Sequence, residues 1–155
     1  MKFEEAIKKE KIRDVIVPRG IRVKKETPYG QVVAKLQAEH KFCAIILDGN
    51  KILGIFTERD ALMRGLLQKT DPATPIEKIM TPDPVTIQEE DSVARAIRLM
   101  YEGKYRHLPV VNSKQEFTGL ISVRDIVYYL SENYPYEVYN LPPDPHKHSA
   151  TSEGA

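Results

Sequence analysis

The sequence predicts a mixed α/β (α+β) protein built from two similar β-α-β-β-α repeats. Two observations lead to this fold class. The chain resembles itself at a fixed spacing, and each copy alternates short apolar runs with capped amphipathic segments. At 155 residues the chain has the length of one compact domain, or of two small halves that share a core.

The internal repeat has an offset of 64 residues, which places Ile12–Asp60 over Ile76–Asp125. After the hairpin turn the offset becomes 65, so that Gly54–Asp60 (GIFTERD) lies over Gly119–Asp125 (GLISVRD). Loops tolerate such a one-residue insertion far better than helices or strands do. The two copies are therefore expected to share one fold.

Each repeat opens with a strand and a helix. The first helix is expected to start at Thr27 with Pro28 in its first turn, and the second near Asp91 or Ser92. Helical spacing directs a set of apolar residues toward the core, namely Val32, Val33, Leu36, Val93, Ala96, Ile97 and Met100. The expected strands are Ile21–Val23, Ala44–Leu47 and Ile52–Phe56, then Val85–Ile87, Leu108–Val111 and Phe117–Ile121.

A hairpin and a final helix complete each repeat. The turn Asp48-Gly49-Asn50 between two apolar runs is a hairpin signal, and Asn112–Glu116 takes its place in the second copy. Pro109 lacks an N–H group, so it is expected at an edge or an irregularity of its sheet. The final helices follow Thr57 and Ser122.

The two repeats need each other for stability, because a unit of roughly 55 residues buries little apolar surface alone. We expect the two sheets to pack together through their apolar faces, related by a pseudo-twofold axis. The predicted divisions are a helical segment at 1–11, the repeats at 12–70 and 71–133, and an extended Pro-rich tail at 134–155.

Composition argues against several classes of function. The formal net charge of +1 gives no overall attraction to nucleic acid or to a membrane. No apolar run approaches the roughly 20 residues of a spanning helix, and the opening MKFEEAIKKE lacks the apolar core of a signal peptide. Cys43 is the only cysteine, which excludes an internal disulfide and a Cys-based zinc site. A cytoplasmic location is the resulting expectation.

The paired G-φ-φ-[T/S]-x-R-D segments, each after a hairpin strand, resemble the signature of the cystathionine-β-synthase (CBS) domain. Ile79-Met80-Thr81, Val85-Thr86-Ile87 and the run 107–111 (HLPVV) add to the resemblance, which covers about residues 12–130. It implies a tandem pair, or Bateman module, with two clefts for adenosine-containing ligands. The ligand implied is AMP or ATP, with ADP, NAD or S-adenosylmethionine as further possibilities. The resemblance also implies a homodimer and a regulated partner protein.

Thr57 with Asp60, and Ser122 with Asp125, stand three residues apart at the start of the final helices. One interpretation is a capping box, in which hydroxyl and carboxylate satisfy N–H groups of the first turn. The other is a ligand site, because a helix N-terminus attracts anions and a carboxylate can accept bonds from ribose hydroxyls. The two interpretations are compatible.

Four basic or polar positions extend the candidate site. Arg59 and Arg124 precede the two aspartates and could offer paired donors to a phosphate, the alternative being solvated surface arginines. His107 could contact phosphate or be structural. Thr86 lies where the family contacts adenine.

The first cleft departs from the family pattern, because Arg22 is the counterpart of Thr86. This arginine could clamp a phosphate or fill the adenine slot. The second-repeat cleft is therefore the better candidate.

The resemblance further implies that Leu108 and Pro109, directly after His107, take part in nucleotide binding.

Two other functions compete with a nucleotide sensor. An enzyme would need a nucleophile beside a base or a metal site, and no such motif is found. His146 and His148 in the tail are a poor metal site, since nothing supplies further ligands. The second alternative is a nucleotide-independent dimerisation module with vestigial clefts, which intact Asp60 and Asp125 argue against.

Overall fold

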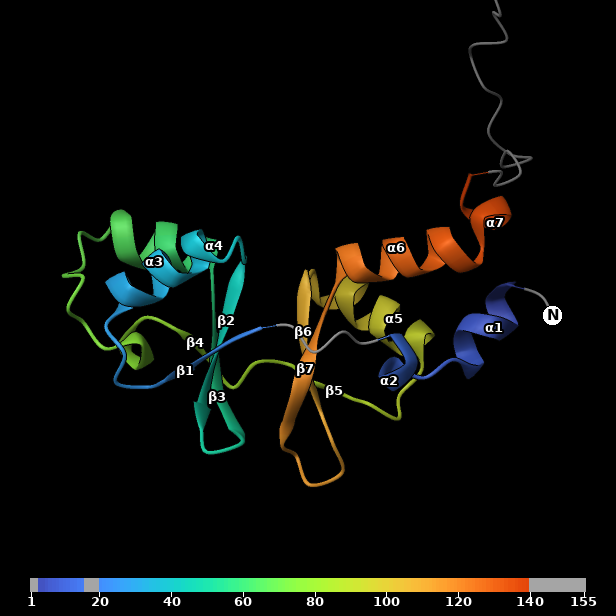
Figure 1. The fold of residues 1–155 in the computed structure, drawn as a ribbon, viewed down its shortest axis with the longest axis horizontal. Coiled ribbons are helices and arrows are strands. Elements are labelled where there is room, and N and C mark those ends of the chain that lie inside the picture. Colours follow the sequence, from blue (N-terminus) through green and yellow to red (C-terminus); the bar gives the residue numbers. More distant parts are fainter. Residues whose placement is uncertain (1–2, 16–19, 140–155) are drawn as a thin grey trace, which may run out of the picture.

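The computed structural model describes residues 3–15 and 20–139 as two α/β halves whose sheets face each other (Figure 1). In each half a parallel strand pair is followed by an antiparallel hairpin. The first sheet has the order β1 (Ile21–Lys24), β2 (Cys43–Asp48), β3 (Lys51–Thr57), β4 (Thr81–Pro82). The second has the order β5 (Ile87–Gln88), β6 (His107–Val111), β7 (Phe117–Ser122). The predicted fold class of two β-α-β-β-α repeats is confirmed.

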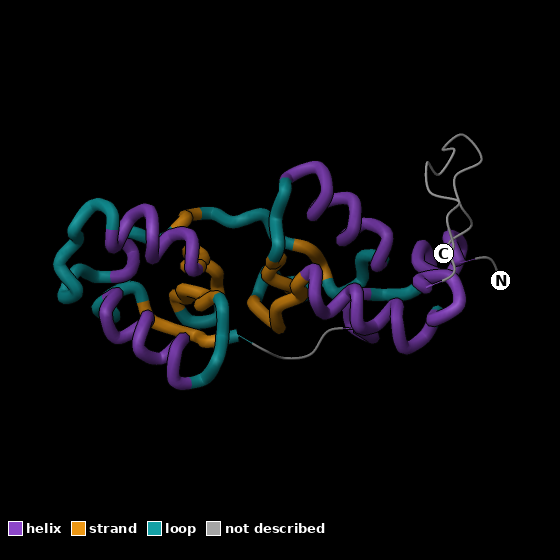
Figure 2. Tube along the Cα trace, turned by 90° about the horizontal axis from the view of Figure 1, so that it is seen from above, coloured by secondary structure: helices purple, strands orange, loops and turns teal. Residues whose placement is uncertain are grey.

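Helices cover the outer side of each sheet (Figures 1 and 2). The first half carries α3 (Tyr29–Ala38) and the short α4 (Glu58–Asp60), which continues as a π-helical turn, η1 (Ala61–Leu66). The second half carries α5 (Val93–Gly103) and α6 (Val123–Asn133). The predicted inward positions Val32, Leu36, Val93, Ala96 and Met100 are buried.

The opening residues of each repeat pack on the half that is formed mainly by the other repeat. The helices α1 (Phe3–Lys9) and α2 (Ile12–Val15) lie against α5 at the second half, where Ile12 is fully buried. In exchange, the 3-10 turn η2 (Ile76–Lys78) buries Ile76 in the core of the first half, and β4 extends the first sheet. Each predicted repeat therefore sends its opening residues to the other half.

Apolar side chains from both sheets form a shared core between them. Ile45 and Ile55 of the first sheet pack with Phe117 and Leu120 of the second. The hairpins also meet, because the Phe117 N–H donates to the Asn50 carbonyl at 2.8 Å. The predicted packing of sheet on sheet is confirmed.

The strand predicted at Val85–Ile87 is wrong in its bounds, because β5 begins only at Ile87. Val85 is 39% exposed, and Thr86 lies in the loop before the strand. Pro109 explains the shortening. Ile45, the residue of the first sheet that is equivalent to Pro109, pairs with β1. Pro109 has no N–H group to donate to β5, so the pairing of β5 with β6 starts at the residue after Pro109. The predicted irregularity thus falls within the middle strand of the sheet.

Two helix predictions also need correction. The first-repeat helix begins at Tyr29 rather than Thr27, because Pro28 is extended, with ψ 134°, at its N-cap. The tail predicted to be extended starts with a helix, α7 (Pro135–Tyr139), since proline suits a first helical position that needs no N–H donor. The remainder of that tail, with His146 and His148, lies outside the described residues. No helix in the described ranges is long and apolar enough to cross a membrane.

Candidate functional site

A cavity of about 270 Å³ opens between the two halves. Its second-half wall carries four of the predicted ligand-binding residues, together with Leu120 and Tyr128: His107, Ser122, Arg124 and Asp125. Its first-half wall consists of Gly20 and the run 40–43. The tertiary structure therefore assembles the predicted second-repeat site and places residues of the first repeat opposite it.

Ser122 and Asp125 form a capping box at the N-terminus of α6. Oδ2 of Asp125 accepts hydrogen bonds from the N–H and the hydroxyl of Ser122, both at 2.9 Å. Oγ of Ser122 in turn accepts from the Asp125 N–H at 3.1 Å. The box fixes a half-buried carboxylate in the cavity wall, at the positive end of the helix dipole.

The equivalent capping box at Thr57 and Asp60 makes its hydrogen bonds within the first half. Oδ2 of Asp60 accepts from the Thr57 N–H at 2.9 Å, and Oδ1 accepts from the Thr81 hydroxyl at 3.0 Å. Nε of Arg64 lies 3.9 Å from the same Oδ1. Asp60 is only 7% exposed, and these contacts hold its carboxylate within the first half, so its predicted ligand role stays a prediction. Thr57 and Asp60 do not line the cavity between the halves.

The two predicted arginines differ in their surroundings. Arg124 stacks on Tyr128, with its guanidinium carbon 5.2 Å from the ring centroid and Nε donating to the tyrosine hydroxyl at 3.1 Å. Stacking of this kind holds a guanidinium in place for an anionic group. Arg59, by contrast, is an exposed residue of α4 outside the cavity wall.

His107 stands in the cavity wall at the first position of β6, paired with Ser122 of β7. Burial lowers its pKa below the ordinary value, because the charged imidazolium loses hydration. The Asp125 carboxylate opposes this effect, the Arg106 guanidinium reinforces it, and Glu58 opposes it weakly. The neutral imidazole is thus favoured in the unliganded protein.

Four further predicted residues do not line this cavity. Leu108 and Pro109 are buried in β6, and Thr86 is half-buried in the loop before β5. The Arg22 guanidinium carbon lies 4.9 Å from the centroid of the Phe117 ring, across the junction of the two halves. A ligand role for these four residues stays a prediction.

The first-half wall contains residues that the sequence analysis did not single out: His40, Lys41 and Phe42. The repeat alignment could have indicated these residues. It pairs Cys43 with the predicted site residue His107, so the residues before Cys43 are expected beside the equivalent position of the first half. Burial raises the pKa of the Cys43 thiol to about 12, which leaves it an inert wall residue. In the part of the chain that the structure describes, no group of three His, Cys, Asp or Glu side chains could hold a metal ion.

Sequence comparison identifies both repeats. A family model described as CBS domain matches residues 12–66 and again residues 76–132. The CBS domain-containing protein CBSCBSPB1 of Arabidopsis thaliana is 33% identical over 112 residues, which is 70% of this chain and 21% of that protein. A 17.7 kDa protein of Acidianus ambivalens is 26% identical over 117 residues, or 75% of this chain and 70% of that protein. The chain thus spans about a fifth of the length of the Arabidopsis relative.

Solved structures share the fold. The CBS domain protein PAE2072 of Pyrobaculum aerophilum, complexed with AMP, has a TM-score of 0.70 at 23% identity, covering 79% of this chain and 98% of that chain. The CBS domain pair of protein MJ0100, in complex with 5′-methylthioadenosine and S-adenosyl-L-methionine, has a TM-score of 0.70 at 22% identity, covering 77% and 98%. With two matching repeats and this architecture, the chain belongs to the CBS domain family and forms a CBS domain pair.

Proposed function

We propose that this chain is a regulatory module that binds an adenine nucleotide, AMP or ATP, in the cleft between its halves. The observation that carries the proposal is the position of Asp125 and Ser122, which present the N-terminus of α6 to a cavity shared by both halves. The ligands named for two similar structures, AMP for one and methylthioadenosine with S-adenosylmethionine for the other, support an adenosine-containing ligand.

The walls of the cleft suit the parts of such a ligand. A carboxylate has about four acceptor positions, so Asp125 can accept bonds from ribose hydroxyls while it caps α6. Phe42 and Leu120 offer apolar surface for the adenine ring. Arg124 offers N–H donors for a phosphate. We propose binding rather than catalysis, and two observations support this: the Ser122 hydroxyl is engaged in the capping box, and the Cys43 thiol is buried and protonated.

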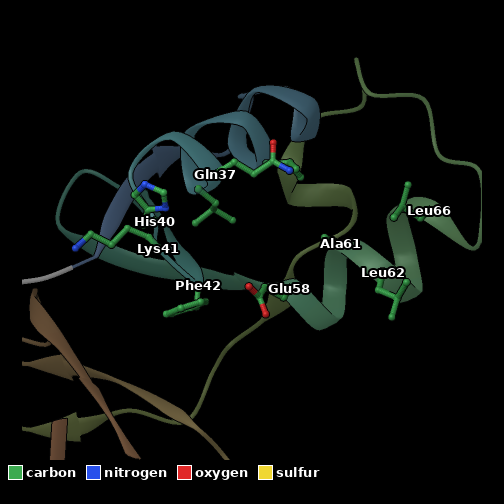
Figure 3. A pocket seen from close by; sticks show the side chains of 10 residues that line it. Gln37, His40, Lys41, Phe42, Glu58, Ala61, Leu62 and Leu66 are labelled. Atoms are coloured by element: carbon green, nitrogen blue, oxygen red, sulfur yellow. The ribbon is translucent and has the colours of Figure 1, made fainter. Parts of the chain in front are cut away.

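A second copy of the chain is the partner that the helical face suits. A groove of about 470 Å³ runs between α3 and η1, and its far end is lined by Leu62 and Leu66 (Figure 3). Leu66 is 69% exposed, and α6 adds the exposed Val123 and Val127. Exposed apolar side chains gathered on one face mark an interaction surface. We infer a homodimer through this face.

The nucleotide cleft and the apolar groove share one wall. His40, Lys41 and Phe42 line both of them, and Figure 3 shows these side chains at the end of the groove opposite Leu66. A ligand that fixes this turn would favour one arrangement of the dimer, or of a regulated partner protein, over another. This shared wall is the route by which ligand binding would be signalled.

A thermal-shift titration with AMP, ADP, ATP, NAD and S-adenosylmethionine tests the proposal. A ligand present at 100 times its Kd adds about 2.7 kcal/mol, which is a rise in Tm of roughly 5–10 °C for a chain of this size. We expect Asp125→Ala to abolish the rise. The matched control is Asp48→Ala, which removes an exposed carboxylate at the first hairpin, away from the cleft, and should leave the rise unchanged.

The same titration distinguishes the proposed nucleotide sensor from the main alternative function. If no adenine compound raises Tm at millimolar concentration, the chain is a nucleotide-independent interaction module. If Asp125→Ala retains the full rise, the ligand binds elsewhere and the assignment of this cleft is overturned.

A further inference from the structure

One tyrosine joins the first described helix to the last two. The hydroxyl of Tyr134, which stands between α6 and α7, donates to Oε1 of Glu10, directly after α1, at 2.6 Å. The Tyr134 ring also lies 5.3 Å from the ring of Phe3 in an edge-to-face arrangement. Figure 1 shows α1 and α7 at the end of the second half that lies away from the first half. This contact is therefore remote from the cleft between the halves.

The helix α1 depends strongly on this tyrosine. Its seven residues are too few for a helix that is stable by itself. Ala6 is its buried residue, and Ile7 packs, partly buried, against the core of the second half. The other residues after Phe3 are charged and exposed: Glu4, Glu5, Lys8 and Lys9. The ring contact and the hydrogen bond of Tyr134 thus supply a large share of what docks α1.

The chain directly after α1 is fixed more firmly. The Glu10 carbonyl accepts from the Val93 N–H at 2.9 Å, and the Ile12 N–H donates to the Asp91 carbonyl at 2.9 Å. Ile12 is also fully buried in the core of the second half. The helix α1 can therefore leave its place while the segment after it stays bound, with Glu10 as the hinge.

The carboxylate of Glu10 is incompletely satisfied where it meets Tyr134. Its Oε2 is buried and has no hydrogen-bond partner among the residues that the structure describes. A buried polar atom without a partner costs free energy, and that cost disappears when release of α1 lets water reach the atom. The hydrogen bond to Glu10 raises the pKa of Tyr134, so the hydroxyl stays a donor at neutral pH. The docked state of α1 is thus balanced against an open one.

The helix α6 connects this contact with the proposed nucleotide cleft. The capping box of Ser122 and Asp125 at its start lies in the cavity wall, and Tyr134 stands at its end. A helix of eleven residues is about 16 Å long and moves as one rigid element. The Tyr134 N–H donates to the Leu130 carbonyl at 2.7 Å, which ties the tyrosine to the last turn of α6. Ligand and latch therefore both require α6 in this position.

We propose that α1 is a releasable strap, latched by the Tyr134 hydroxyl on Glu10, and that a ligand in the cleft favours the latched state through α6. The ligand control rests on the proposed function. Release unfolds α1, because the helix is too short to persist alone, and it uncovers the apolar surface against which Ile7 packs. The strap thus gives the module two states that a bound nucleotide distinguishes.

Hydrogen–deuterium exchange of the full chain without ligand tests the latch. In the wild type we expect the amides of α1 to exchange faster than those of α5, because α1 opens locally. Tyr134→Phe keeps the ring beside Phe3 but removes the donor, so it should speed exchange in α1 about 5- to 100-fold and leave α5 unchanged. Glu10→Ala should act similarly, and the double variant should add little, since both changes remove the same bond.

The matched control is Tyr136→Phe, which removes the same hydroxyl from an exposed ring of α7. It should change exchange in α1 by no more than about twofold. Exchange is then repeated with saturating AMP and with saturating ATP. A bound nucleotide should slow exchange in α1 of the wild type, and it should lose this effect in Tyr134→Phe, where the latch is absent.

The outcomes separate this proposal from the proposed function. If α1 of the wild type exchanges as slowly as α5, or if Tyr134→Phe leaves α1 unchanged or speeds both helices alike, the strap is overturned. If a nucleotide binds but leaves exchange in α1 unchanged, ligand control is overturned while the nucleotide cleft stands. If neither AMP nor ATP binds, the cleft assignment is wrong and ligand control falls with it, whereas exchange in the unliganded chain still decides the latch.

Discussion

The hydroxyl of Thr81 donates a hydrogen bond of 3.0 Å to Oδ1 of Asp60, which joins β4 to the helix after β3. The two aspartates of the repeated motif differ in their surroundings. Asp60 is nearly buried and hydrogen-bonded within the first half, whereas Asp125 faces a cavity.

Loss of the Thr81 hydroxyl should destabilise the first half without affecting the cleft. In Thr81→Val the carboxylate of Asp60 loses one donor in a nearly buried site, which should lower the free energy of unfolding by about 1–3 kcal/mol. Urea denaturation measures this difference. Thr74→Val, where the described chain shows no side-chain hydrogen bond, is the control and should change stability by about 0.5 kcal/mol or less. An equal loss in both variants would contradict the structural role of Asp60.

Stability should fall on mild acidification because of His107. Burial lowers the pKa of His107 in the folded chain from 6.5, so the unfolded chain binds the proton more strongly. The stability that this group contributes is fully present above the unfolded pKa of 6.5, and it is lost as the pH falls through 6.5 toward the lower folded pKa.

Urea denaturation of the unliganded chain at about pH 7.5 and about pH 5.5 measures this loss. The variant His107→Gln keeps a polar side chain but cannot gain the charge, so its stability should vary less between the two pH values. A variant that loses as much stability as the wild type would show that other groups cause the pH dependence.

Cys43 should resist alkylation in the native state. Its side chain is nearly buried, and its thiol pKa is raised to about 12, so almost no thiolate is present near neutral pH. Mass spectrometry after iodoacetamide treatment should find slow modification in buffer and rapid modification in urea. Equal rates in the two conditions would show that the cleft wall opens readily.

A charge in the apolar groove should disrupt self-association. Leu62→Glu places a carboxylate among the apolar side chains that line the groove, and burying it in a dimer would be costly. Light scattering should then report a monomer for this variant and a dimer for the wild type. Tyr139→Glu on α7, an exposed position outside the groove, is the control and should remain dimeric. A dimeric Leu62→Glu would place the interface on another face.

The fold was largely predictable because it depends on patterns that are local in sequence. Apolar spacing indicated the buried faces of α3 and α5, and the repeated motif indicated two capping boxes, which the structure contains. The wrong bounds arose at two prolines, where the backbone differs from that of other residues. The helix α3 begins after the extended Pro28, and β5 is short because Pro109 of the neighbouring strand has no N–H group.

The site was predictable only in its second-repeat half. His107, Ser122, Arg124 and Asp125 lie within one repeat and carry the family motif, so their alignment alone indicated them. His40 and Lys41 belong to no motif and come near Asp125 only when the two sheets pack together. No pattern along the chain reports that residues more than 80 positions apart line one cavity.

The sequence by itself determined the two repeats, their β-α-β-β-α order and the pair of aspartates that begin the final helices, because these follow from hydrophobic spacing and capping chemistry between near neighbours. Only the tertiary structure decided that the opening segments exchange halves, that Thr81 engages Asp60, and that Asp125 faces a cavity with Lys41 on its opposite wall. The physical reason is that burial of apolar surface brings distant segments together, and the distances between their polar groups are set by that packing rather than by local sequence.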